Sequence, residues 1–351
     1  MKNLIFICCI LIILFKTGNV LSDNKIFNVN NVEISKEISR NKDKLVSKAF
    51  QKAFDELINR LLLNEDYERL SNINLAQIKK LISYYQIINQ NEEKGDQENK
   101  NIIKVNVFFE KDRMHNFFYN RNILYSDIIN TEVILFPLLK REEQYFIYTQ
   151  NYFYENWNEE RSDNLIQYTL PAENIENIQK INSNKDNIYN LQISDFFKEH
   201  ETDNIVFAHI EINENTAEVF LNTRIEGKKI NKNLSINKKK DLNNKDFYNK
   251  VILEIDNVIR DLIKSQNLID VRTPSFLNVE IKLNNKSNLV DFDKRLKKID
   301  LIDNFYVQQL NKDYVLVKIK YLGKINKIID KLKDQNINLK MIAGHWQLDI
   351  I

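Results

Sequence analysis

The four histidines are the side chains of this 351-residue chain best suited to acid–base or metal chemistry, and they are His115, His200, His209 and His345. No two of them stand at the i, i+4 spacing that places two ligands on one helix face, and there is no HExxH motif, so no metal is expected. His200 and His209 are close enough in sequence to meet across a turn from a helix to a strand, with Asp203 between them. One hypothesis is a hydrolase-type site assembled from Asp, Glu and His near His200 and His209. The other interpretation is that these are ordinary surface and turn residues.

Other catalytic signatures are missing from the sequence. Paired carboxylates such as Glu142-Glu143 and Glu159-Glu160 are explained by solvated faces, because a catalytic carboxylate needs an apolar pocket or a charged neighbour that shifts its pKa. The sequence contains no GxSxG motif, and its five glycines form no phosphate-binding loop. We therefore predict no catalytic residue and no cofactor.

The N-terminus predicts export. Lys2 precedes an unbroken apolar run from Leu4 to Phe15, and Val20 and Ser22 are suitably small for cleavage after Ser22. The run is shorter than the ~20 residues that span a bilayer. Residues 1–22 are therefore interpreted as the signal peptide of a protein of the periplasm or cell envelope. An uncleaved segment that anchors the chain in the inner membrane is the alternative.

Composition narrows the remaining classes of function. Both cysteines, Cys8 and Cys9, lie in the apolar run, so the mature chain would hold no disulfide, thiolate metal site or cysteine nucleophile. Lys and Arg number 51 against 49 acidic residues, and a net charge of +2 gives no field that draws the chain to nucleic acid. A nucleic-acid partner is therefore not expected.

An aromatic-rich stretch from Tyr145 to Trp157 is the most unusual composition in the chain. Tyr and Trp combine a large contact area with a low ordering cost, so Tyr152, Tyr154 and Trp157 are candidates for an interaction surface. Aromatic residues also dominate protein cores, so packing of a strand and a helix is the other explanation.

A lysine-rich segment from Glu226 to Asp241 is the second candidate surface, and Lys238, Lys239 and Lys240 stand at its end. Such a patch could attract anionic lipid headgroups or an acidic partner, which would make the chain a peripheral membrane-surface protein. Alternation through Ile230, Leu234 and Ile236 favours instead an ordinary strand with solvated lysines.

Length and the order of elements predict three small α/β units after the signal peptide, with a fold class between α/β and α+β. The expected domains are an N-terminal domain at 23–130, a central domain at 131–272 and a C-terminal domain at 273–351. The N-terminal domain is expected to contain, in order, a strand at Ile26–Ile34, a helix at Asn41–Leu63, a helix at Leu75–Tyr85, a charged loop at Glu92–Lys100, a strand at Ile102–Phe109 and a helix at Asp112–Asn120.

The central domain is expected to open with a strand covered on both faces, because the run from Val133 to Leu139 is continuously apolar. The further elements expected are strands at Tyr145–Thr149 and Leu165–Leu170, helices at Tyr152–Arg161 and Ile193–His200, strands at Ile205–Ile212 and Ala217–Ile225, and a long helix from Phe247 to Leu262.

The C-terminal domain is expected to have the strand, helix, strand, strand, helix, strand order of ferredoxin-like folds. The expected elements are a strand at Phe276–Leu283, a helix at Asp291–Ile299, a hairpin of Phe305–Leu310 and Val315–Tyr321, a helix at Ile325–Leu332, and one interrupted strand at Leu339–Ile350.

Several segments together resemble a known family. They are Ile26 to Leu63, Lys104 to Phe118, Glu132 to Leu139 and Asp203 to Ile210, followed by the C-terminal unit. In their apolar spacing these segments are similar to the proteobacterial envelope family catalogued as domain of unknown function 2066. The resemblance implies an exported protein, and with the lack of catalytic motifs it predicts a non-catalytic binding or accessory module for other envelope proteins.

Overall fold

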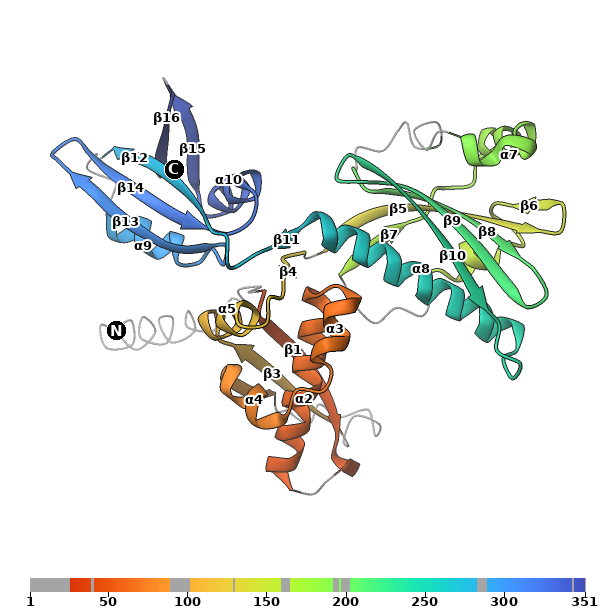
Figure 1. Cartoon of the computed structure of the whole chain (residues 1–351), viewed down its shortest axis with the longest axis horizontal. Helices are drawn as coiled ribbons and strands as arrows, with labels where there is room; N and C mark the ends of the chain where they lie inside the picture. Colours follow the sequence, from red (N-terminus) through yellow and green to blue (C-terminus); the bar gives the residue numbers. More distant parts are fainter. Residues whose placement is uncertain are drawn as a thin grey trace, which may run out of the picture. The chain divides into compact units, whose positions relative to one another are not determined.

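The chain folds as a mixed α/β protein, which confirms the fold class predicted from the sequence (Figure 1). The computed structural model describes residues 26–38, 41–88, 102–128, 130–158, 165–191, 196, 203–282, 289–342 and 344–350. The expected signal peptide, the expected loop at Glu92–Lys100 and most of the helix expected at Ile193–His200 lie outside the described residues. Within the described ranges, no helix is both long and apolar enough to cross a bilayer.

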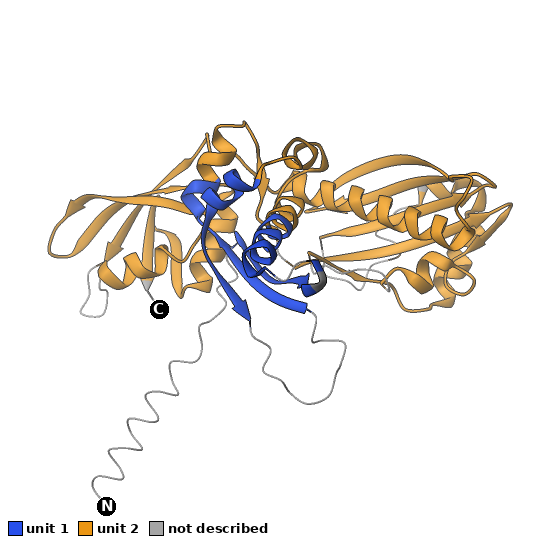
Figure 2. Ribbon diagram, turned by 90° about the horizontal axis from the view of Figure 1, so that it is seen from below, with its two compact units in different colours: residues 1–53, 75–114 blue, residues 54–74, 115–351 orange. Residues whose placement is uncertain are grey.

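The chain divides into two compact units, which Figure 2 colours separately. Unit 1 is Met1–Ala53 with Leu75–Met114, and unit 2 is Phe54–Asn74 with His115–Ile351. Each of the three expected domains nevertheless contains one main β-sheet of its own. The division into three domains stays a prediction about independent folding.

The N-terminal region holds a three-stranded antiparallel sheet and several helices. Its elements are β1 (Asn28–Ser35), the 3-10 helix η1 (Lys36–Ile38), α2 (Lys42–Leu61), α3 (Asn64–Leu70), α4 (Leu75–Leu81), β2 (Ile82–Ile88), β3 (Ile102–Phe109), α5 (Lys111–Tyr119) and β4 (Tyr125–Ser126). The strand order is β1-β3-β2. Apolar residues recur every three or four positions along α2, and its Phe50 meets Tyr85 of β2 edge to face with ring centroids 5.1 Å apart. The stripe therefore packs on the sheet, as the sequence predicts.

One expected element of this region is wrong. The helix expected at Leu75–Tyr85 ends at Leu81, and the chain continues directly as strand β2. The residues after Leu81 are mostly β-branched or aromatic, and such residues fit a pleated surface better than a helix. Pairing with β3, which brings Tyr84 opposite Phe108, completes the switch from helix to strand.

The central region holds a six-stranded mixed sheet in the order β10-β9-β8-β5-β6, with β7 also paired to β5. Its elements are β5 (Thr131–Arg141), β6 (Gln144–Phe146), α6 (Tyr152–Asn156), β7 (Ile166–Thr169), α7 (Ile175–Ser183), the 3-10 helix η3 (Lys185–Asn190), β8 (Ile205–Ile212), β9 (Thr216–Ile225), β10 (Lys228–Asn237), α8 (Asn244–Gln266) and β11 (Leu268–Ile269). Strand β5 is parallel to β7 and β8, whereas β8, β9 and β10 are antiparallel neighbours.

Both faces of the central sheet are covered, as the continuous apolar character of β5 predicts. Val133 and Leu135 join a core with α8, whereas Ile134 and Phe136 join a second core with α7 and η3. The helix α7 and the 3-10 helix η3 are absent from the expectations above. The side chain of Asn174 caps α7 by accepting a hydrogen bond from the N–H of Glu176 (2.7 Å), and this capping residue is the sequence signal for α7.

The C-terminal region holds a five-stranded sheet with one face buried under helices. Its elements are β12 (Ser275–Lys282), α9 (Leu289–Leu296), β13 (Ile302–Leu310), β14 (Tyr314–Tyr321), α10 (Ile325–Asp334), β15 (Ile337–Ile342) and β16 (His345–Ile350), and the strand order is β13-β14-β12-β16-β15. Alternate residues of β14, among them Val315 and Val317, are fully buried, as are Phe292 of α9 and Leu332 of α10. The alternate residues form the other face, which we call the open face; there Phe276 and Asn278 of β12 are exposed, and Lys318 and Lys320 of β14 are half-buried.

The expected single last strand is wrong, because the chain forms a hairpin of β15 and β16 instead. Gly344 has a φ of +82°, a left-handed conformation that glycine adopts readily and that allows the chain to reverse. Strand β16 then pairs in parallel with β12, bringing Trp346 beside Val279. The six expected elements are present in order, but the sheet has five strands, so a four-stranded ferredoxin-like sheet is not confirmed.

Candidate functional site

His209 is the buried histidine of the central sheet. It lies on β8 between Leu138 of β5 and Phe220 of β9, with only 2% of its surface exposed. The rings of Tyr145 and Tyr189 lie 5.8 and 5.0 Å from its ring, measured between centroids. Its Nε2 atom has no hydrogen-bond partner within the described part of the chain. His209 is thus enclosed by aromatic rings rather than placed beside a reacting group.

Burial sets the charge state of His209. Desolvation lowers its pKa from 6.5 to about 4, because burial penalises the charged imidazolium, while nearby Glu211 opposes the shift. Glu211 itself pairs with Lys140 across the sheet, with 3.2 Å between Nζ and Oε1. The imidazole is therefore neutral at neutral pH. Its proposed partner His200 lies outside the described residues, Asp203 is exposed, and no group of three metal-ligating side chains occurs among the described residues. The hydrolase-type hypothesis stays a prediction, because no carboxylate or second histidine among the described residues is hydrogen-bonded to Nε2 of His209.

The aromatic-rich stretch is tied into the core of the central sheet. Asn151 caps α6, where its Oδ1 accepts from the N–H of Phe153 (3.1 Å). Its Nδ2 donates to the backbone oxygens of Pro137, Phe146 and Ile147 at 2.8, 3.1 and 2.9 Å. The buried side-chain amide of Asn151 thus connects α6 to β5 and to the end of β6. It fixes the aromatic-rich stretch against the central sheet.

The three aromatic candidates therefore pack mainly inward. Trp157 is fully buried beside Tyr168, so its side chain offers no contact surface. Tyr152 donates to Asn249 Oδ1 (2.6 Å), and Tyr154 donates to the backbone oxygen of Pro171 (2.9 Å), so both half-buried tyrosines use their hydroxyls inside the chain. Core packing is the explanation that fits these residues.

The lysine-rich segment is an edge strand. Strand β10 ends the central sheet, and its Lys228, Lys229 and Lys232 are exposed. Lysines on an edge strand prevent it from pairing with another chain, because pairing would desolvate their charges. The interpretation as an ordinary strand with solvated lysines is confirmed, and this gives the lysines a structural role. Membrane contact stays a prediction.

The three lysines that follow this strand are not equivalent. Lys238 is half-buried, donates to Asn244 Oδ1 (2.5 Å) and lies 6.0 Å from the ring centre of Phe247, so it holds the start of α8. Lys239 and Lys240 are exposed. Of the expected triplet, only the last two are therefore exposed to solvent.

The C-terminal sheet offers a different kind of edge. Strand β13 ends this sheet, and its residues 304–310 include no charged side chain. Tyr306, Val307 and Leu310 are 48%, 46% and 63% exposed. On the adjoining open face Phe276 is 51% exposed, and Lys318 Nζ lies 4.4 Å from its ring centre. We identify β13 and this open face as the candidate binding site, which the sequence reasoning missed because strand order is needed to recognise an edge.

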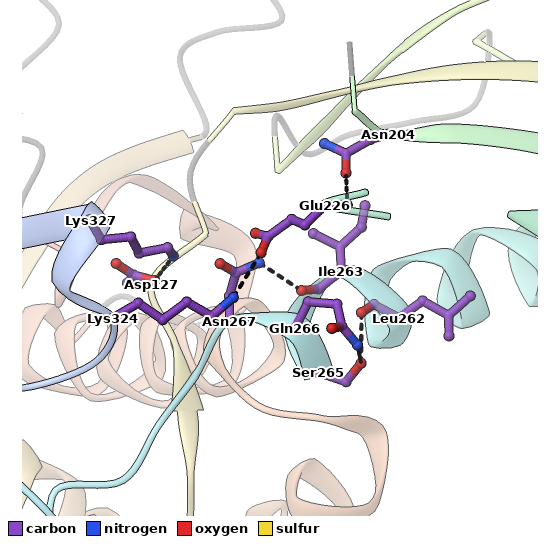
Figure 3. A network of polar contacts seen from close by, with 10 residues as sticks. All are labelled: Asp127, Asn204, Glu226, Leu262, Ile263, Ser265, Gln266, Asn267, Lys324 and Lys327. Atoms are coloured by element: carbon purple, nitrogen blue, oxygen red, sulfur yellow. Dashed lines mark hydrogen bonds and ion pairs between the residues drawn. The ribbon is translucent and has the colours of Figure 1, made fainter. Parts of the chain in front are cut away.

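A polar network joins the C-terminal sheet region to the rest of unit 2 (Figure 3). Lys324 at the start of α10 pairs with Glu226 (2.9 Å), which stands in the two-residue turn between β9 and β10. Lys327, one turn along α10, pairs with Asp127 in the segment after β4. Asn204 Oδ1 accepts from the backbone N–H of Glu226 (3.0 Å) and thereby holds the turn. These two ion pairs attach α10 to other parts of unit 2 and involve no residue of the open face of the sheet.

No family model matches the chain, and no curated protein or solved structure shows significant similarity to it. The resemblance to the envelope family catalogued as domain of unknown function 2066 therefore stays a prediction.

Proposed function

We propose that this chain is an exported, non-catalytic protein that binds another protein of the cell envelope with its C-terminal sheet. The observation that carries this proposal is exposed apolar surface at the β13 edge of one small sheet. Tyr306, Val307 and Leu310 are exposed on β13, and Phe276 is exposed on β12, two strands away. Lys318 of the intervening strand β14 pairs with Tyr306 and lies over the ring of Phe276. Contiguous exposed apolar surface of this kind marks interaction sites.

The charges around this surface favour a protein partner over a polyanion. Lys320 is paired with Asp303 at 2.6 Å, and Lys318 lies over the ring of Phe276. Glu280 contributes a negative charge to the same face, where its Oε1 accepts from Gln347 (3.4 Å). A surface whose cations are already engaged releases few counterions, and nucleic-acid binding depends on that release. A mixed aromatic and neutral surface suits a protein interface.

Site-specific photo-cross-linking in living cells tests the proposal. A photo-reactive phenylalanine derivative replaces Phe276 in one variant and Tyr306 in a second. A third variant carries it at Leu253 of α8, which is 52% exposed against 51% for Phe276 and therefore serves as a matched control. We expect the first two variants to give the same discrete protein adduct and the Leu253 variant to give none.

Two results would contradict the proposal. One is the absence of any adduct at both Phe276 and Tyr306 while the protein is present at its normal level. The other is an identical set of adducts at all three positions, which would show random collisions. An adduct made of lipid rather than protein at Phe276 would favour the membrane-surface alternative instead.

A further inference from the structure

We propose that the partner supplies an extended segment that adds to β13 as a sixth strand of the C-terminal sheet. This inference rests on the proposed function and specifies how the partner is held. In strand addition, the backbone hydrogen bonds of a sheet edge provide affinity, and the alternate side chains provide specificity. The partner is therefore an extended, uncharged polypeptide segment rather than a folded surface.

Strand β13 is held to the sheet on its inner side. It pairs with β14 from Ile302 to Leu310, with register shifts between Ile302 and Asn304 and between Val307 and Gln309. Its Phe305 contacts Phe292 of α9 with ring centroids 6.0 Å apart. Among the described strands, none lies on the outer side of β13. A sheet edge with an unfilled row of backbone donors and acceptors is a ready site for pairing.

The position of addition follows from local contacts. Asn304 Oδ1 accepts from the N–H of Phe305 (2.8 Å), so the start of the strand has its own polar partner. Beyond it, all residues from Tyr306 to Leu310 are exposed, and no described strand pairs with their outer edge. We assign strand addition to this segment.

Strand β13 is longer than the edge strands β2 and β15 and carries fewer charges than the edge strand β10. Strand β10 carries three lysines, and β15 is a short strand with Lys340 in it. Charge, brevity and β-bulges are three of the devices that keep edges from pairing. Strand β13 has bulges, at Ile302/Asn304 and Val307/Gln309, but it is neither short nor charged over residues 304–310. Strand β2 in unit 1 is an uncharged edge as well, but it is shorter, with seven residues. Strand β13 is nine residues long and carries a single charge, Asp303, which is engaged by Lys320.

The same features define the chemistry of the partner segment. Residues 306–310 contain no charge that could attract one of opposite sign, so we expect the segment to be uncharged over about five residues. Its side chains must alternate, because one set faces Val307 and the other faces Tyr306. The open face at Phe276 continues the surface that the second set would meet.

Peptide selection on the mature full-length chain tests strand addition. A display library of linear peptides of about ten residues is the probe, since typical strands are of this length or shorter. We expect selected peptides to be uncharged over their central residues and to slow amide hydrogen exchange at residues 306–310 by roughly tenfold or more. Single N-methyl groups placed along a selected peptide should abolish binding at every second position, where the backbone N–H points to β13. At the positions between, where the N–H points away, they should have little effect.

The variants Gln308→Lys and Gln308→Thr separate the edge from the face. Gln308 stands at a bulge between Val307 and Gln309, where it has no partner in β14, so neither substitution disturbs the ladder. Gln308→Lys places a lysine on the edge strand, as β10 has, and should weaken peptide binding by roughly tenfold or more. Gln308→Thr should leave peptide binding unchanged. Equal thermal unfolding of both variants would show that the fold is intact.

The outcomes distinguish this inference from the proposed function. Strand addition would be overturned by peptides that protect amides outside residues 306–310 and bind the Gln308→Lys variant as tightly as the unmodified chain. The proposal that the chain binds a protein would then still stand. A chain that selects no peptide would also overturn strand addition. The cross-linking at Phe276 and Tyr306 then decides the proposed function separately.

Discussion

At the scale of single residues, the chain uses its unusual side chains for structure. Asn151 ties α6 to the sheet, Trp157 fills the core, and His209 is held neutral among aromatic rings. Each belongs to a pattern that suggested chemistry or recognition in the sequence. Burial decides between the two interpretations, because a side chain without access to solvent cannot meet a partner.

His209 predicts a specific response to acid. Its pKa in the folded chain is about 4, against 6.5 when it is solvated, so between these pH values the unfolded chain binds a proton that the folded chain does not. Stability is therefore lost as the pH falls from 6.5 toward 4, by up to about 3 kcal/mol. In His209→Phe this loss should be absent, because phenylalanine has no proton to bind.

The measurement is urea unfolding at a series of pH values, followed by Trp157 fluorescence in a Trp346→Phe background. These are the two tryptophans of the chain, so the signal then reports on the central sheet. We expect the curve of unfolding free energy against pH for the protein that retains His209 to fall more steeply in acid than the curve for the His209→Phe variant. Parallel curves would show that His209 does not titrate with a lowered pKa.

At the scale of elements, Lys264 of α8 stabilises the end of another helix. Its side chain is 1% exposed, and its Nζ donates to the backbone oxygens of Asn59 (2.7 Å) and Leu62 (2.6 Å) at the C-terminal end of α2. A cation there satisfies carbonyls that have no partner within the helix and complements its dipole. Lys264→Met should lower the free energy of unfolding by about 3 kcal/mol, because the buried carbonyl of Leu62 and the partly buried carbonyl of Asn59 both lose their donor.

Lys264→Arg is the control for charge, and Lys245→Met is the control for lysine loss, since Lys245 is exposed on the same helix. Denaturant unfolding of the three variants measures the difference. A Lys264→Met protein as stable as Lys245→Met would show that the two carbonyls find other donors, and the assignment of Lys264 as a cap would be withdrawn.

The edge strand β10 gives a prediction about association. Replacing Lys228, Lys229 and Lys232 by Thr removes the charges that guard the edge but keeps residues that favour a strand. We expect this triple variant to form dimers and larger species at concentrations where the unmodified chain stays monodisperse by light scattering. Replacing Lys239, Lys240 and Lys245 by Thr removes the same charge outside the strand and should have no such effect. Equal association of both triple variants would attribute the effect to net charge alone.

Sequence patterns predicted elements better than they predicted edges. Strands at 102–109 and 205–212 have the expected bounds because alternation or continuous apolar character defines them locally. The switch from α4 to β2 at Leu81 was missed because the pairing with β3, not local periodicity, decides it. The candidate site at β13 was beyond reach for the same reason: an uncharged strand is a buried strand or an open edge depending on neighbours that are distant in sequence.

At the scale of the whole molecule, the network of Lys324, Glu226, Lys327 and Asp127 connects α10 to the turn and linker that precede it in the chain. Charge pairs at such a surface weaken as salt rises, except where they are shielded from water. Asp127 has a side chain that is only 9% exposed, so its pair with Lys327 should resist salt, whereas the more exposed pair of Lys324 and Glu226 should not. The Lys327 pair is therefore the firmer of the two attachments.

Removing the buried attachment tests this order. Lys327→Ala leaves Asp127 shielded without its cation and should speed hydrogen exchange in α10 and the segment after β4, at low and high salt alike, because an unpaired buried carboxylate costs more than a lost surface pair. Lys324→Ala should change exchange in the same peptides far less, and only at low salt. Mass spectrometry of exchanged peptides distinguishes the two. If Lys324→Ala had the larger effect, exposure would not rank these pairs, and the turn at Glu226 would be the principal attachment of the C-terminal sheet.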